Sequence, residues 1–224
     1  LVVSALYFNR QLDLLLHTEP GFRTKNILVA NLVYESRDFN NFSEQRYLQE
    51  RARTQALNEK ILACPFIEYH QSCYESIIEK TYGTNYINAK GESAYLNIMY
   101  VSPQFFRMFD IDIEEGSIPE KPERSTYVLN RAAMKALNFS SLGEAAVVED
   151  NRKRRDANAP MSTISAVVKD YYNGHLTAGA VPTIYEVSGF GGPRYQIAYP
   201  EGRKQDLLNY LKETMKEIYG AEEF

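Results

Sequence analysis

The sequence predicts an α+β fold in which both ends of the chain build an outer α/β part around an inserted, strand-rich middle part. Three observations lead to this fold class. A strand, a helix and a second strand follow one another near the start. A strand and an amphipathic helix recur at the end, and several short strands lie between these two regions. An insertion into a discontinuous outer part accounts for this order.

The first strand–helix–strand unit is bounded by clear signals. Residues 26–35, NILVANLVYE, are rich in branched and aromatic side chains and predict a buried strand. Asn41 with Glu44 three residues later predicts a helix start, because each side chain can satisfy a free backbone donor of the other. Apolar residues then recur at helical spacing until Pro65 ends the helix. Residues 66–74 predict the second strand.

The end of the chain repeats this pattern. Residues 195–199 predict a short strand, and an apolar stripe predicts a helix that ends at Gly220. The stripe consists of Leu207, Leu208, Leu211, Met215 and Ile218. The middle part is predicted from short strands at residues 94–101, 125–129, 162–168 and 182–187, with short helices at 102–109 and 130–137.

Composition excludes several classes of protein. The 224 residues, with 44% hydrophobic and 24% charged side chains, suit a folded chain of two small domains. The net charge of -4 argues against a nucleic-acid partner, which requires a concentrated positive surface. Cys64 and Cys73 lack zinc-ligand spacing. A strand over residues 66–73 would hold their sulfur atoms beyond disulfide reach, so we expect free thiols.

No catalytic, cofactor-binding or metal site is predicted. His17, His70 and His175 lie in no recognisable nucleophile motif. Residues 188–193, SGFGGP, are followed by a strand rather than a helix, which favours a turn over a phosphate-binding loop. Residues 110–115 are acidic but lack the spacing of a calcium loop, and we expect an exposed turn.

A concentrated positive run, RKRR, comprises Arg152, Lys153, Arg154 and Arg155. One interpretation is a solvated hairpin tip, since acidic residues flank the run on both sides. The other is a contact with a partner protein or with anionic lipid head groups, which basic clusters attract. These four residues are the candidate partner contact of the sequence.

The first residues are unusually apolar. Residues 1–7, LVVSALY, are too few to span a membrane, which takes about 20 residues. They either form a buried N-terminal strand or helix, or are the outer end of a membrane helix that continues as a projecting stalk over residues 1–17. Arg10 and Asp13 follow them, where such a helix would emerge into water.

Residues 100–119, YVSPQFFRMFDIDIEEGSIP, contain a strand, the motif V-S-x-x-F-F, a hydrophobic pair and an E-G turn. This segment resembles one in the MacB-like periplasmic core domain of ABC-transporter permeases of the MacB and FtsX type. The positions that match the family pattern are Val101, Ser102, Phe105, Phe106, Phe109, Ile111, Glu115 and Gly116.

Further segments resemble the family in the family's own order. Residues 128–137 are similar to its V-x-[LI]-N strand-to-helix step, and residues 164–171, ISAVVKDY, to its VVKD segment. Residues 9–28 resemble its stalk, with matches at Gln11, Gly21, Phe22, Asn26, Ile27 and Leu28. These features look most like the Bacteroidetes-type permeases. Ala166 departs from the family, which often has Gly there.

The resemblance implies a domain plan. Residues 1–21 would be a stalk helix after a truncated first membrane helix. Residues 22–85 and 190–224 would form a Porter-like mixed α/β subdomain, and residues 86–189 an inserted, strand-rich Sabre-like subdomain. A further strand and a second membrane helix would follow Phe224.

The resemblance also implies a function. The chain would be the periplasmic, non-enzymatic domain of an inner-membrane permease for efflux or another export, with ATP hydrolysed by a cytoplasmic ATP-binding subunit. It would pass motion to a periplasmic adaptor protein or to the substrate, a mechanotransmission role, beside a second permease copy. One alternative is a freestanding extracytoplasmic sensor or ligand-binding domain, and a hydrolase ranks lowest. A sensor requires a concave pocket with converging polar groups.

Overall fold

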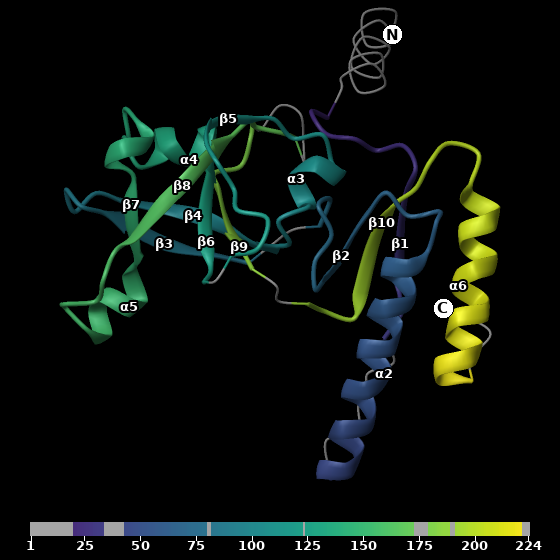
Figure 1. Cartoon of the computed structure of the whole chain (residues 1–224). Coiled ribbons are helices and arrows are strands. Elements are labelled where there is room, and N and C mark those ends of the chain that lie inside the picture. Colours follow the sequence, from purple (N-terminus) through teal and green to yellow (C-terminus); the bar gives the residue numbers. More distant parts are fainter. Residues whose placement is uncertain are drawn as a thin grey trace, which may run out of the picture.

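The computed structural model describes residues 20–33, 43–79, 82–122, 124–172, 179–188 and 191–220. Within these ranges the chain forms five α-helices and ten β-strands, which confirms the predicted α+β class. The strands make one sheet of three strands and one of seven (Figure 1). No helix of the described ranges is long and apolar enough to cross a membrane. The helix predicted for residues 1–17 lies outside these ranges.

The three-stranded sheet brings the two ends of the chain together. Its order is β1 (Ile27–Asn31), β10 (Arg194–Ala198) and β2 (Tyr69–Cys73), and the central β10 is antiparallel to both neighbours. Ile27 lies opposite Ala198, so the two segments that we expected to share a sheet are paired directly. Strand β1 is shorter than predicted and ends at Asn31.

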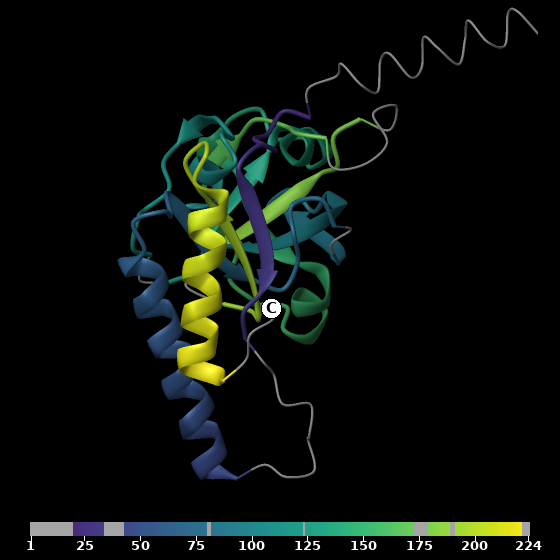
Figure 2. The same cartoon turned by 90° about the vertical axis from the view of Figure 1, so that its right-hand side faces the viewer.

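Helices α2 (Glu44–Ala63) and α6 (Lys204–Tyr219) lie side by side on one face of this sheet (Figures 1 and 2). Apolar spacing of three and four residues gives each helix one buried stripe. The stripes and the sheet share a core of Leu57, Ile61, Leu207, Leu211 and Met215 with Ala30, Leu32, Tyr195 and Ile197.

The cap of α2 differs from the prediction. Ser43 is the N-cap residue, and its Oγ accepts a hydrogen bond from the backbone N–H of Arg46 at 3.2 Å. Asn41 lies outside the described residues, and a cap must directly precede the first helical residue, which is Glu44. The predicted end is confirmed, since α2 stops at Ala63, before Pro65 restricts the backbone.

The seven-stranded sheet closes on itself. The neighbouring strands run in the order β8, β6, β9, β4, β3 and β7, and β7 pairs again with β8. These six strands form a ring, and β5 pairs with the C-terminal half of β8, residues 166–168. Their bounds are β3 (Gly83–Asn88), β4 (Ser93–Val101), β5 (Ile113–Gly116), β6 (Thr126–Asn130), β7 (Ala146–Glu149), β8 (Ser162–Val168) and β9 (Thr183–Val187).

Side chains of all six strands fill the inside of this ring. Alternation sends every second residue to one face of a strand. The inward residues form one cluster, which α4 (Arg131–Ala136) joins through Ala133 and Met134. The strand residues of this cluster are Tyr86, Leu96, Ile98, Leu129, Val147, Ile164, Val167 and Ile184.

The outer face of the ring packs against α3 (Phe105–Met108) and a phenylalanine cluster. The rings of Phe105 and Phe106 contact the ring of Tyr185 and each other, and Phe105 also contacts Phe109, with centroids 5.0–6.0 Å apart. Ala198 of β10 belongs to the same buried cluster. The motif VSPQFF therefore supplies the packing between the two sheets.

The chain enters the body between the two sheets. The backbone N–H of Tyr172 donates to the carbonyl oxygen of Pro20 at 2.8 Å, and that of Arg23 donates to the carbonyl oxygen of Phe109 at 2.7 Å. Phe22 makes edge-to-face contacts with Phe109 and Tyr171. Residues 20–23 are thus held by the segments that follow β8 and α3 before β1 joins the three-stranded sheet.

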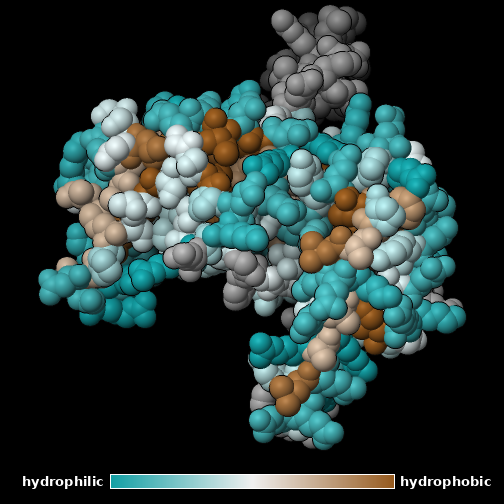
Figure 3. Space-filling view, viewed as in Figure 1, coloured by the Kyte–Doolittle hydropathy of each residue, from teal (hydrophilic) through white to brown (hydrophobic). Residues whose placement is uncertain are grey.

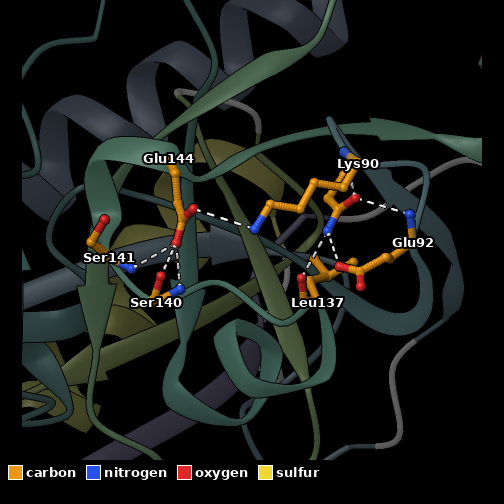
Figure 4. A network of polar contacts seen from close by, with 7 residues as sticks. Lys90, Glu92, Leu137, Ser140, Ser141 and Glu144 are labelled. Carbon is orange, nitrogen blue, oxygen red and sulfur yellow. Dashed lines mark hydrogen bonds and ion pairs between the residues drawn. The ribbon is translucent and has the colours of Figure 1, made fainter.

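A polar network closes the β3–β4 turn onto the end of α4 (Figure 4). Asn88 is 1% exposed, and its Oδ1 accepts from the N–H groups of Lys90 and Glu92. Its Nδ2 donates to the carbonyl oxygen of Leu137 at 2.9 Å and to the carboxylate of Glu92 at 2.8 Å. Lys90 reaches the carboxylate of Glu144 at 3.6 Å. This network binds a turn and a helix end that are distant in sequence.

Candidate partner-contact site

The RKRR run lies on a short helix in the connection between two paired antiparallel strands, which is the tip of a hairpin. Helix α5 (Asp150–Arg155) follows β7, and the chain then returns into β8, the partner strand of β7. Asp150 stands in the first turn, where a carboxylate is favourable. It pairs with Arg154, four residues later, at 2.6 Å. The flanking acid Asp150 therefore favours a helical turn at the tip of the β7–β8 hairpin.

The four basic side chains have different surroundings. Arg154 is engaged with Asp150, and the Nε of Arg155 donates to the carbonyl oxygen of Asn151 at 3.2 Å. Arg152 borders a small cavity at the end of the ring. Lys153 is half-buried. The surface over α5 is hydrophilic (Figure 3), but these residues do not form one cluster of free charges. Their role as a partner contact stays a prediction.

Five polar side chains gather where the inside of the ring meets α5, and we call them the ring mouth. Tyr127 and Tyr100 both lie opposite Glu186 in the strand pairings, and Tyr86 lies opposite Glu149. A cavity of about 30 Å³ lies among Tyr86, Tyr127 and Glu149. Its remaining lining residues are Val147, Val148, Arg152, Pro160 and Ser162.

Strand alternation explains why these polar side chains face the inside. Tyr100 follows the inward-facing Ile98 by two residues, and Glu186 follows the inward-facing Ile184 by two. Side chains two residues apart on a strand lie on the same face. The apolar rows of the ring therefore continue into polar residues at its open end, where Tyr100 is 42% exposed.

Burial keeps the phenols of the ring mouth neutral. Burial raises the pKa of Tyr86, and the Glu149 carboxylate raises it further. Burial also raises the pKa of Tyr127, with an added contribution from Glu186. The pKa of Tyr100 is raised by burial and then by Glu186. All three hydroxyls stay protonated near neutral pH and can donate hydrogen bonds.

The ring mouth suits binding better than covalent chemistry. The Oγ of Ser125 donates to Oε1 of Glu186 at 2.7 Å. Glu149 forms no ion pair with any described residue. The mouth thus presents two carboxylates and three phenols, and a nucleophile paired with a general base is not among these five side chains. Converging polar groups at the end of a closed sheet are typical of a binding site.

Sequence reasoning missed the ring mouth because its residues come from five different strands. Each of these strands contributes one polar residue to an inward face that is otherwise apolar. Glu186 in TIYEV and Glu149 in AVVE are charged at positions that continue inward-facing apolar rows. A charged residue at a core-facing position is unusual, and it was the one feature of the sequence that could have indicated this site.

The acidic stretch is partly a strand, which corrects the expected turn. Glu114 and Glu115 lie in β5, and both pair with Arg131, the second at 2.7 Å. Asp112 lies 3.7 Å from the Lys169 ammonium. No group of three potential metal ligands gathers anywhere in the described ranges.

Close packing against β2 requires a glycine at position 192 of the Gly-rich segment. A Cβ at Gly192 would lie 2.3 Å from the carbonyl oxygen of Cys73, so the backbone passes close to the end of β2. Cys73 and Cys64 are buried free thiols, and burial raises the pKa of Cys73 to about 12. Burial lowers the pKa of His70 in β2. His17 and His175 lie outside the described residues.

Comparisons with known proteins find likeness in structure only. No protein-family model matches this sequence, and no curated protein matches it. The periplasmic region of MacB from Actinobacillus actinomycetemcomitans aligns with a TM-score of 0.55 and 15% identity, over 93% of this chain and 90% of that one. The chain has the fold of MacB-type periplasmic domains.

Two further structures agree with the MacB-type fold. The extracellular domain of YknZ, a noncanonical ABC-type transporter from Gram-positive bacteria, aligns with a TM-score of 0.54 and 8% identity, over 88% of this chain and 97% of that one. A permease domain from Porphyromonas gingivalis aligns with a TM-score of 0.51 and 14% identity, over 73% of this chain and 68% of that one. The MacB-like resemblance of the sequence is thereby confirmed for the fold.

Proposed function

We propose that this chain is the extracytoplasmic domain of an inner-membrane ABC-transporter permease and that it couples cytoplasmic ATP hydrolysis to conformational change outside the membrane. The observation that carries the proposal is the MacB-type fold over 93% of the chain. Fold alone leaves many functions open, so the structure must also suit the task.

The entry of the chain supports a mechanical role. Residues 20–23 are hydrogen-bonded to Tyr172, which follows β8, and to Phe109, which follows α3, and β1 then begins at Ile27 in the other sheet. A displacement that arrives along the chain before Pro20 would therefore act on both sheets. Packed elements pass on such a displacement, whereas a flexible link would dissipate it.

We further propose that the two sheets correspond to two subdomains. Residues 22–85 and 190–224 would form the outer Porter-like subdomain, and residues 86–189 the inserted Sabre-like one. The sheets support a border near the first boundary, since β2 ends at Cys73 and β3 begins at Gly83.

The partners of such a domain would include a cytoplasmic ATP-binding subunit, reached through the membrane part, and a second permease copy. Helix α5 would contact a periplasmic adaptor rather than lipid. In Figure 1, α5 lies far from the purple segment that leads into β1. If the preceding residues lead to the membrane, the basic helix faces away from it.

The test uses the full permease with its ATPase in lipid nanodiscs. A spin label at the exposed position 212 of α6, introduced as Lys212→Cys, reports the distance between the two domain copies. We expect the distance distribution to change when ATP and vanadate trap the ATPase, and to stay unchanged with an ATPase-inactive partner. Identical distributions with and without ATP would overturn the coupling proposal and favour the sensor alternative.

A further inference from the structure

We propose that the contact between the two sheets has two arrangements and that a pair of buried glutamines changes hydrogen-bond partners between them. In the second arrangement, the side-chain amide of Gln196 donates to the hydroxyl of Ser102 across the contact. This inference concerns the chain by itself and holds whether or not the chain belongs to a permease.

The two sheets touch along β2, which packs against α3 and β4. Two connections link the sheets, one from Cys73 to Gly83 and one from Val187 to Arg194. No described strand of one sheet pairs with a strand of the other, so side chains hold the contact together. Packed surfaces of this kind can have two discrete arrangements, because interdigitated side chains do not deform continuously.

The middle of this contact is polar. Gln71 of β2 and Gln196 of β10 lie opposite each other in the strand register, and their side chains are 3% and 0% exposed. Tyr69 and Ala198, two residues away on the same strands, pack in the phenylalanine cluster. Residues two apart on a strand share a face, so both glutamines face the ring. Glutamine is seldom buried in such a position, where an apolar side chain would pack equally well.

The hydrogen bonds fix the direction of both amides. The backbone N–H of Ser102 donates to Oε1 of Gln71 at 3.1 Å, which turns Nε2 of Gln71 towards Oε1 of Gln196, at 2.6 Å. Turning over either amide, or both, would place two donors or two acceptors face to face. The Nε2 of Gln196 therefore points away from Gln71, and it has no acceptor among the described residues.

A second unsatisfied group lies on the other side of the contact. The Oγ of Ser102, between β4 and α3, is buried and forms no hydrogen bond with any described residue. The unused donor thus belongs to one sheet and the unused hydroxyl to the segment attached to the other. Gln71 bonds to both residues, so the two groups lie near each other. Buried polar groups are normally hydrogen-bonded, and a displacement that brings these two together satisfies both at once.

The two arrangements exchange bonds of the same kind. The observed arrangement keeps both hydrogen bonds of Gln71 and leaves Gln196 and Ser102 with unused groups. The second arrangement joins Gln196 to Ser102 and gives up the bond between the Ser102 N–H and Gln71. Because gain and loss are similar, the second arrangement should be a minor state with a population on the order of 1%.

The experiment is NMR relaxation dispersion on the isotopically labelled chain. We expect the backbone amide of Ser102 and the side-chain amides of Gln71 and Gln196 to exchange between two states at one common rate, in the microsecond to millisecond range. The same rate should extend to the backbone amides of Tyr69 and Ala198, since the sheets themselves move. No dispersion, unrelated rates, or exchange confined to the side chains would overturn the proposal.

Variants of Ser102 decide whether its hydroxyl is the second partner. Ser102→Ala keeps the backbone N–H that bonds Gln71, so the observed arrangement should fold as before, while the dispersion at Gln71 and Gln196 disappears. Ser102→Thr keeps a hydroxyl and should restore it. Ser93→Ala is the matched control, because Ser93 is exposed at the start of β4, and it should leave the exchange unchanged. Dispersion at Gln196 that persists in Ser102→Ala would overturn the proposal.

Discussion

Asn88 shows how a single side chain can join distant segments of this fold. Its amide makes four hydrogen bonds, two to the backbone of its own turn, one to Glu92 and one to the carbonyl oxygen of Leu137. Burying an amide removes its hydrogen bonds to water. This cost in free energy is offset only when its donors and acceptors form hydrogen bonds within the protein. Its hydrogen bonds join the β3–β4 turn to Leu137 at the end of α4.

We predict that Asn88→Ala lowers the free energy of unfolding by about 2–4 kcal/mol, because several hydrogen bonds are lost together and a buried carbonyl keeps no partner. Asn85→Ala is the matched control, since Asn85 is exposed on the same strand. Urea unfolding of both variants measures the difference. Equal losses in the two variants would contradict the role assigned to Asn88.

Glu144 should make stability depend on pH. Hydrogen bonds from the Ser140 side chain and backbone, together with Lys90, lower the pKa of Glu144 from 4.5 to about 2. A lowered pKa in the folded state contributes stability above the unfolded value, and this contribution disappears as pH falls from 4.5 towards 2. We predict that Glu144→Gln is less stable than wild type at pH 7 and that the two converge over this window. Urea unfolding at a series of pH values tests it, and a constant difference would contradict it.

The helices and strands differ in how well local sequence patterns predict them. Strand β8 runs from Ser162 to Val168, as predicted, because branched residues and alternation agree there. Strands β3, β5 and β7 were not predicted, since segments such as IEEG have no apolar alternation of their own. Their pairing in the sheet overrides their weak local preference.

The N-cap at the start of α2 contributes to the stability of the protein, and substitutions at this residue measure how much. Ser43 caps the helix through its hydroxyl, so Ser43→Ala should lower the free energy of unfolding by about 1 kcal/mol. Ser43→Asp keeps an oxygen acceptor and should retain most of the stability. Thermal and urea unfolding measure both. A loss in Ser43→Asp as large as in Ser43→Ala would show that capping is not the cause.

In the whole molecule, the contact between the two sheets decides how a displacement spreads. Gln71 of β2 donates to Gln196 of β10 at 2.6 Å and accepts from the backbone N–H of Ser102 at 3.1 Å. The side chains of Gln71 and Gln196 are buried, at 3% and 0% exposure. This buried polar link joins the three-stranded sheet to the segment that leads from β4 into α3.

Phe22 provides the corresponding link at the entry of the chain. We predict that Phe22→Ala speeds hydrogen exchange at the amides of Arg23 and Tyr172, whose hydrogen bonds lie beside its ring. Exchange in β10 should change little, because that strand is bonded on both edges. Mass-spectrometric hydrogen exchange measures both regions. Equal acceleration everywhere would indicate global destabilisation instead of a local clamp.

The fold class and the VSPQFF packing motif could be predicted from local patterns in the sequence. Period-two and helical apolar spacing predicted β4, β6, β8, β9 and α6, and the VSPQFF segment indicated the MacB-type fold. These properties depend on neighbouring residues, whose spacing sets which face of an element is apolar. The free state of both cysteines followed from the same local reasoning.

Only the tertiary structure decided the closure of the ring and the ring mouth. The β7–β8 pairing joins strands that a helix separates, and nothing in either strand alone specifies it. Glu149 and Glu186 stand 37 positions apart in the printed sequence, yet both act on the phenol of Tyr86. Long-range pairing brings such residues together because strand register, rather than sequence distance, sets which side chains face each other across a sheet.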